Sequence, residues 1–185
     1  MEDESLIVKA QHGDASAFGQ LVERYQDAVF RAAFLVLHDA SEAEDAAQEA
    51  FMKAYRALHR FHGDALRPWL LKISVNEALN RRKARNRRIA VAQRIGTAGQ
   101  ALEWPLDETL IDRERARLLR SALEALREQE RVLIYLRYFL VLSEKELAEY
   151  FGCAPGTIKS RLHRALARLR EIVTRRYPGL LVEMS

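Results

Sequence analysis

The stretch from Leu142 to Leu166, LSEKELAEYFGCAPGTIKSRLHRAL, decides the fold. It reads as a helix, a tight turn and a second helix that starts near Pro155. Ser143 and Glu146 stand in the register of a capping box, which marks the start of the first helix. Gly152 permits the turn. This order predicts a helix-turn-helix, in which the second helix enters the major groove of DNA. An ordinary helical hairpin inside a bundle is the alternative.

The second of these helices has two contrasting faces. Apolar residues recur at spacings of three and four, which places them on one face: Ile158, Leu162, Ala165, Leu166 and Leu169. The opposite stripe carries hydroxyl and guanidinium groups: Thr157, Ser160, Arg161, Arg164 and Arg168. Such groups suit phosphate oxygens and guanine edges. The apolar face is therefore expected to pack on the first helix and the charged face to contact DNA, although charged helix faces are often only solvated.

The composition describes a globular, helical chain. It has 185 residues, 49% hydrophobic and 30% charged, which suffices for one domain or two small ones. Only 8 glycines and 4 prolines, with few β-branched runs, predict an all-α fold. The single cysteine excludes a disulfide framework and fits a reducing compartment. No apolar run approaches the roughly 18 residues of a membrane span, so we expect a cytoplasmic protein.

Charge alternates along the chain. Residues 1–66 carry a net charge of −6 and residues 67–95 a net charge of +8. Residues 96–130 then carry −3, and residues 131–185 carry +5. Two basic blocks separated by acidic ones suit a chain that contacts a polyanion at two places and another partner between them.

Further helix signals lie in the first half. Asp14 can cap a long helix whose apolar positions run from Phe18 to Val36. Ser41 and Glu44 stand in capping-box register before a third helix. Pro68 suits the first turn of a fourth helix, which ends in a basic tail.

A segment rich in turn-forming residues divides the chain. Residues 96–109, GTAGQALEWPLDET, hold two glycines and a proline without a sustained apolar period. We therefore expect two small helical domains, 1–95 and 112–185, joined by a flexible linker at 96–111. The second domain should hold helices at about 112–125, 128–139, 143–151 and 155–176.

The ordered motifs together resemble a known family. The stretch from Leu126 to Arg170 resembles the C-terminal domain of extracytoplasmic-function (ECF) sigma factors, within the sigma-70 family of bacterial transcription initiation factors. EAEDAAQEAFMKAYRALHRF, followed by RPWLLKISVNEALNRRKARNRR, resembles their N-terminal domain. The resemblance covers nearly the whole chain. It implies a factor that binds core RNA polymerase, directs it to promoters through the −35 and −10 elements and aids promoter melting.

The resemblance implies roles for particular residues. In the family, a helix with an Asp-x-x-Gln-Glu signature grips the largest polymerase subunit, and here that signature is Asp45, Gln48 and Glu49. The loop HRFHGDA, which contains Phe61, corresponds to a loop that captures a flipped base of the −10 element. Trp69 and Asn76 correspond to residues that approach the same element, while the helix-turn-helix reads the −35 element.

The candidate contacts form three sets. Those to the −35 duplex are Thr157, Lys159, Ser160, Arg161 and Arg164. Those to the −10 element are Phe61, Trp69, Asn76, Asn80 and Lys83. Those to polymerase are Asp45, Gln48 and Glu49. We also expect a cationic series beside the −10 set to contact phosphates: Arg81, Arg82, Lys83, Arg85, Arg87 and Arg88.

Three positions depart from the family pattern. Asn80 stands where the family usually has Asp, and Lys83 where it has Arg. Arg127 replaces a common proline near the start of the helix expected at 128. By resemblance, such factors are commonly held inactive by an anti-sigma partner, which we expect here to cover both the Asp45–Glu49 face and the Arg161–Arg164 face.

Signals of catalysis are weak. The five histidines form no zinc-protease frame, and the spacing of His59 and His62 lacks a second ligand pair. Cys153 lies in the predicted turn, where a small filler explains it better than redox chemistry. We therefore expect no enzyme activity, no metal and no cofactor.

Two rival functions remain from the residues alone. A free-standing repressor or activator that binds duplex DNA as a dimer would explain the second half of the chain, but it leaves the acidic 41–60 helix unassigned. A protein-interaction module with a basic tail would not need the stripe of hydroxyls and arginines.

Overall fold

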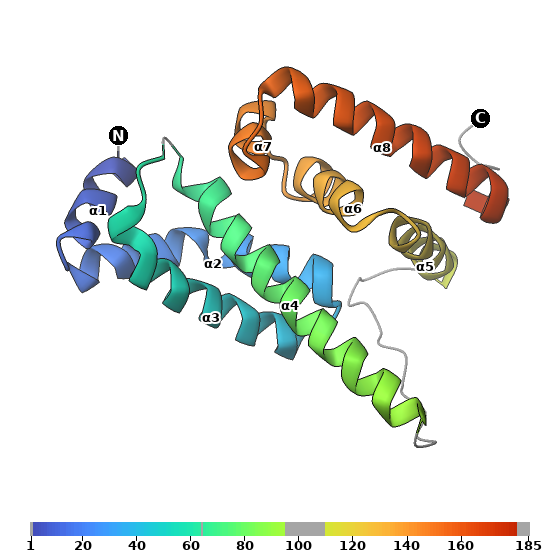
Figure 1. Cartoon of the computed structure of the whole chain (residues 1–185), viewed down its shortest axis with the longest axis horizontal. Coiled ribbons are helices and arrows are strands. Elements are labelled where there is room, and N and C mark those ends of the chain that lie inside the picture. Colours follow the sequence, from blue (N-terminus) through green and yellow to red (C-terminus); the bar gives the residue numbers. More distant parts are fainter. Residues whose placement is uncertain (1, 64, 95–109, 181–185) are drawn as a thin grey trace. The chain divides into compact units, whose positions relative to one another are not determined.

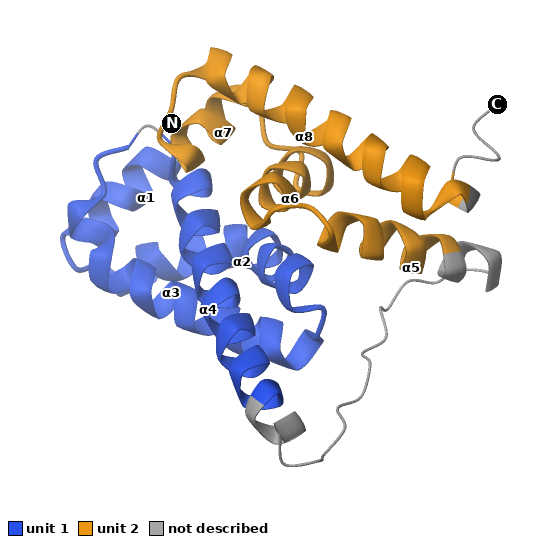
Figure 2. Cartoon of the chain, turned by 45° about the vertical axis from the view of Figure 1, so that its right-hand side comes forward, with its two compact units in different colours: residues 1–104 blue, residues 105–185 orange. Residues whose placement is uncertain are grey.

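The computed structural model describes residues 2–63, 65–94 and 110–180. Every regular element in these ranges is helical, which confirms the predicted all-α fold (Figure 1). The chain forms two compact units, residues 1–104 and 105–185, which are blue and orange in Figure 2. The predicted linker, 96–111, lies outside the described residues except for its last two positions, which begin a helix. None of the described helices is both long enough and apolar enough to span a bilayer.

The described part of the N-terminal unit contains four α-helices. These are α1 (Glu2–Gln11), α2 (Ala15–Leu37), α3 (Ala40–Ala57) and α4 (Leu66–Arg94), with the short 3-10 helix η1 (Leu58–Arg60) after α3. Helices α2, α3 and α4 pack against one another, and α1 lies on α2 and touches η1. The predicted first-turn position of Pro68 in α4 is confirmed.

A series of alanines lines the inner face of α3. Ala43, Ala46, Ala47, Ala50 and Ala54 are all buried. Since alanine adds only one carbon beyond the backbone, this face lets α2 and α4 approach α3 closely. We call these five positions the alanine seam.

The helix caps partly follow the sequence signals. Asp14 caps α2 as predicted, because its carboxylate accepts hydrogen bonds from the Ser16 and Ala17 amides at 2.9 and 3.0 Å. The predicted capping box at Ser41 and Glu44 is wrong. Helix α3 begins at Ala40, and its cap is Asp39, whose carboxylate accepts from the Glu42 amide at 2.8 Å.

The reversal of the chain before α3 explains that error. His38 ends α2 in the left-handed conformation, with φ of 56°. The next residue, Asp39, returns to extended backbone and so takes the cap position two residues before Ser41.

The described part of the C-terminal unit contains the remaining helices. These are α5 (Leu110–Glu124), α6 (Glu128–Ile134), a π-helical turn η2 (Tyr135–Phe139), α7 (Glu144–Phe151), α8 (Pro155–Arg176) and the short η3 (Pro178–Leu180). Helices α7 and α8 form the predicted helix-turn-helix (Figure 1).

Local signals place the turn between α7 and α8. The Ser143–Glu146 capping box is confirmed: the Glu146 carboxylate accepts from the Ser143 amide at 2.8 Å, and the Ser143 hydroxyl accepts from the Glu146 amide at 3.2 Å. Gly152 ends α7 with φ of 63°, a conformation that costs glycine little. The apolar face of α8 also packs as predicted, with Ile158 and Ala165 fully buried.

Val141, just before α7, holds an unfavourable backbone conformation. Its φ is 54°, and its side chain is 71% exposed. Left-handed geometry disfavours β-branched residues, and the exposed side chain gains little from burial in return. We expect Val141→Gly to stabilise the C-terminal unit by about 1 kcal/mol, after allowing for the greater freedom of glycine in the unfolded chain.

Differential scanning calorimetry of the full chain would measure this change as a higher midpoint for the C-terminal transition. Val141→Ala is the matched control, because alanine keeps the Cβ atom and should recover only part of the gain. A midpoint that does not rise in the glycine variant would contradict the strain.

Candidate nucleic-acid and protein interfaces

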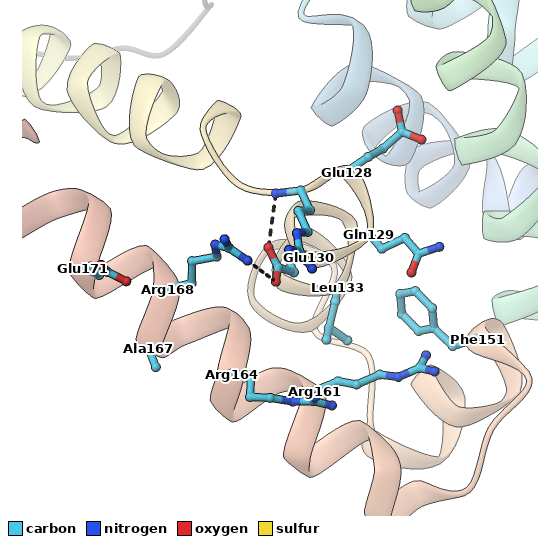
Figure 3. Close-up of a pocket in the computed structure, with 11 residues that line it drawn as sticks. Glu128, Gln129, Glu130, Leu133, Phe151, Arg161, Arg164, Ala167, Arg168 and Glu171 are labelled. Atoms are coloured by element: carbon cyan, nitrogen blue, oxygen red, sulfur yellow. Dashed lines mark hydrogen bonds and ion pairs between the residues drawn. The ribbon is translucent and has the colours of Figure 1, made fainter.

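The charged side of α8 borders a groove within the C-terminal unit. The groove has a volume of about 800 Å³ and lies between α8 and the start of α6, with Phe151 of α7 at one end (Figure 3). Three arginines from successive turns of α8 line it, Arg161, Arg164 and Arg168. Arg127, just before α6, adds a fourth. The arginines of the predicted stripe thus line the α8 side of this groove.

Glu130 of α6 engages the far end of this stripe. Its carboxylate lies 3.5 Å from the Arg168 guanidinium and also accepts a hydrogen bond from the Arg127 amide at 3.2 Å (Figure 3). Arg168 therefore ties α8 to α6. Of the three arginines that line the groove, Arg168 is therefore engaged in an ion pair within the unit.

The first turns of α8 present polar groups in a fixed order. The Ser160 hydroxyl donates to the Thr157 carbonyl at 3.0 Å, and Arg164 donates through Nε to the Ser160 carbonyl at 3.2 Å. Lys159 points toward α7, with its ammonium 3.6 Å from the Glu144 carboxylate. Both side chains of this pair are well exposed, so the pair is worth under about 1 kcal/mol and can readily be exchanged for a phosphate.

Helix α3 exposes an acidic face opposite the alanine seam. Asp45 and Gln48 are exposed and Glu49 is half-buried. The three residues of the predicted polymerase set therefore share one accessible side of the helix.

A network of charges links this acidic face to α4. Arg81 lies 3.6 Å from Asp45 and 3.1 Å from Glu77, and Lys53 lies 2.5 Å from Glu77 and 3.8 Å from Glu49. These contacts join α3 and α4 through alternating charges. Lys53 and Glu77 do not stand out in the sequence, because only the spacing of four between Glu77 and Arg81 indicates a contact.

Two arginines of the expected phosphate-binding series are engaged within the unit. Besides the contacts of Arg81, the Arg85 guanidinium lies 3.1 Å from the Glu42 carboxylate and donates to the Leu37 carbonyl at 3.3 Å. Arg85 thus braces the start of α3 against α4. No local sequence pattern indicates this role, because the partners lie more than 40 residues away.

Glu77 is the least exposed carboxylate of the network, with its side chain 11% exposed. Burial alone would raise its pKa, but hydrogen bonds from Lys53 and Arg81, together with their positive charges, hold the pKa below its ordinary value of 4.5. Its ionised form therefore stabilises the fold at neutral pH. That contribution is complete above pH 4.5 and is lost as the pH falls through the lowered pKa of the folded chain.

We expect Glu77→Gln to destabilise the N-terminal unit by about 1 kcal/mol at pH 7, the usual cost of weakening charged hydrogen bonds. Below the lowered pKa the two proteins should converge, because wild-type Glu77 is then protonated. Urea denaturation across the acidic range would measure this, with exposed Glu44→Gln as the control. A difference in unfolding free energy that persists unchanged in acid would contradict the assignment.

The predicted −10 residues divide into an aromatic pair, Phe61 and Trp69, and an exposed row on α4. Phe61 is buried and packs against half-buried Trp69, with ring centroids 5.1 Å apart and planes tilted by 49°. Asn76, Asn80 and Lys83 are exposed on α4, and their spacing places them with Trp69 on one side of the helix. Phe61 offers no open ring face in this conformation; Trp69 is the more accessible of the two.

No group of three or more metal-ligating side chains occurs among the residues that the structure describes. Cys153, in the turn before α8, is a partly exposed free thiol.

Comparison with known proteins agrees with this arrangement. The Sigma-70 region 2 model matches residues 21–88, and the Sigma-70 region 4 model matches residues 116–169. The chain is 39% identical over 194 residues to the RNA polymerase sigma-H factor of Pseudomonas aeruginosa, covering 98% of this chain and 97% of that protein. It is 38% identical over 176 residues to the ECF RNA polymerase sigma-E factor of Escherichia coli K12, covering 89% and 91%.

A solved structure shares the fold. The sigma factor RpoE from Bartonella quintana, solved in complex with the anti-sigma factor NepR, matches with a TM-score of 0.62 and 28% identity, covering 86% of this chain and 98% of that one. The chain belongs to the ECF group of the sigma-70 family. It is a transcription initiation factor that directs RNA polymerase to promoters.

Proposed function

We propose that this chain divides promoter recognition between its two units. The observation that carries the proposal is the pairing of two unlike surfaces in one chain: the arginine-lined side of α8 and the acidic face of α3 beside the exposed polar row of α4. Residues 1–95 form the unit for polymerase and the −10 element. Residues 112–185 form the unit for the −35 element, and residues 96–111 link them.

The −35 duplex contacts the first turns of α8. Arg161 and Arg164 each donate two hydrogen bonds to a guanine edge, which specifies sequence. Thr157 and Ser160 contribute hydroxyls to the same groove, and Lys159 exchanges Glu144 for a phosphate.

The −10 element contacts α4 and the segment before it. Asn76 and Asn80 offer amide groups to base edges, and Lys83 contacts phosphate. Trp69, supported by Phe61, supplies an aromatic surface on which an unpaired base stacks, which holds the strand open after melting.

Core polymerase binds the acidic face of α3 through Asp45, Gln48 and Glu49. Polymerase supplies the catalysis, and this chain acts as a cytoplasmic binding factor without metal or cofactor. Its own side chains bind and position DNA.

We also infer an anti-sigma partner. The RpoE structure shows that a sigma factor of this fold takes such a partner. A protein that covers Asp45, Glu49 and the Arg161–Arg164 surface would compete with polymerase and DNA by mass action. Affinity purification from resting cells, followed by mass spectrometry, should recover it; recovery of polymerase subunits alone would favour control by abundance.

Run-off transcription tests the function directly. Core polymerase from the same organism, mixed with this chain and genomic fragments, should initiate at discrete sites that core enzyme alone does not use. Binding to duplex DNA without any effect of added core enzyme would instead support a free-standing repressor or activator.

A further inference from the structure

Helix α1 is bonded to the segment that leads into α4. Gln11, its last residue, donates from Nε2 to the Leu58 carbonyl at 3.0 Å and to the Phe61 carbonyl at 2.8 Å. One side-chain amide therefore uses both of its hydrogens to hold the two ends of one short segment. These partners lie 47 and 50 residues away in the chain.

This segment carries Phe61, one ring of the aromatic pair of the proposed −10 surface, and the other ring, Trp69, lies in α4. Leu58 and Phe61 are buried, and the Phe61 ring packs on Trp69. Gly63 also lies close to this ring, since a Cβ atom added there would lie only 3.0 Å from it. The position of the Phe61 backbone therefore determines where the Phe61 ring lies. That ring in turn packs against Trp69.

Helix α1 is itself firmly attached, which makes Gln11 a fixed point. The Asp3 carboxylate at its other end accepts hydrogen bonds from the Tyr25 hydroxyl and the Arg24 guanidinium of α2. Leu6 and Ile7 pack on the core of the unit. The start of α1 is thus held to α2, and its end is held to the Leu58–Phe61 segment after α3.

We propose that Gln11 is a positioning residue for single-stranded DNA: it holds the Leu58–Phe61 segment so that Trp69 presents its ring for base stacking. This inference rests on the proposed role of Trp69 at the −10 element. Gln11 itself does not touch DNA; it acts through the two carbonyls and the Phe61 ring.

The test measures sequence selection on a single strand. Holoenzyme made from the organism's core polymerase and the full chain is mixed with single-stranded oligonucleotides that carry six randomised positions, and the bound fraction is sequenced. Gln11→Met keeps the side-chain length but removes both donors. Gln26→Met, at an exposed glutamine of α2, is the matched control.

We expect Gln11→Met to lower the enrichment of the preferred strand by about tenfold, the effect of losing two partly buried hydrogen bonds. Affinity for core polymerase and for −35 duplex should not change, and Gln26→Met should match wild type. A purely structural role would lower the folded fraction and reduce all three binding activities together.

Gly63→Ala provides an independent second variant. It leaves Gln11 and its bonds intact but crowds the Phe61 ring, so it should also reduce strand selection while sparing duplex and polymerase binding. If wild-type holoenzyme selects no sequence, the proposed −10 role fails and this inference with it. If wild type selects a sequence and Gln11→Met selects it equally well, only the inference about Gln11 is overturned.

Discussion

Replacing Asp45 and Glu49 together by lysine should weaken binding to core RNA polymerase by about 100-fold, because like charges placed across an interface cost several kcal/mol. Both carboxylates belong to the accessible face of α3, opposite the alanine seam. The fold itself should tolerate the change. Asp45 and Arg81 form a partly exposed pair at 3.6 Å, and such pairs contribute under about 1 kcal/mol.

Retention on immobilised core polymerase measures this effect, with duplex binding as the internal check on folding. Glu44→Lys is the matched control, since Glu44 is exposed on the same helix but outside the Asp-x-x-Gln-Glu signature. Equal retention of the double variant and wild type would rule out this face as the polymerase contact.

Arg161→Ala and Arg164→Ala should each lower selectivity for the −35 duplex by about 1–3 kcal/mol, which is the value of one bidentate contact to guanine. This corresponds to a loss of about 5- to 150-fold against a scrambled duplex. The two arginines lie on successive turns of α8 and line the same groove, so each can meet a neighbouring base pair.

Lys159→Ala separates sequence reading from phosphate contact. It should weaken binding to all duplexes alike and flatten the dependence on salt by about one phosphate contact. Competition between specific and scrambled duplexes over a salt series makes the comparison. If the arginine variants lose affinity equally for every duplex, α8 contacts only the phosphate backbone of the DNA.

Local signals explain why the helix-turn-helix was predictable. Ser143, Glu146 and Gly152 act within a few residues of their own positions, and the packing of α8 follows from its apolar period. The cap of α3 was mispredicted because the left-handed His38 set the start of the helix from outside the motif.

Long-range contacts could not be read from the sequence. The ion pair of Arg81 with Asp45 and the bonds of Gln11 to Leu58 and Phe61 join residues that are 36 to 50 positions apart. Their geometry depends on how α1, α3 and α4 pack. The basic series from Arg81 to Arg88 therefore reads as a DNA contact in the sequence, although Arg81 and Arg85 hold α3.

The alanine seam has a consequence for how α3 responds to variation. Its buried positions leave no room for a larger side chain, so enlargement there should lower cellular abundance of the protein through overpacking. On the opposite face, changes at Asp45 and Gln48 should leave abundance intact and alter only transcriptional output. A saturation scan of this one helix, scored separately for protein level and for reporter activity, would therefore show two interleaved patterns that repeat with the helical period.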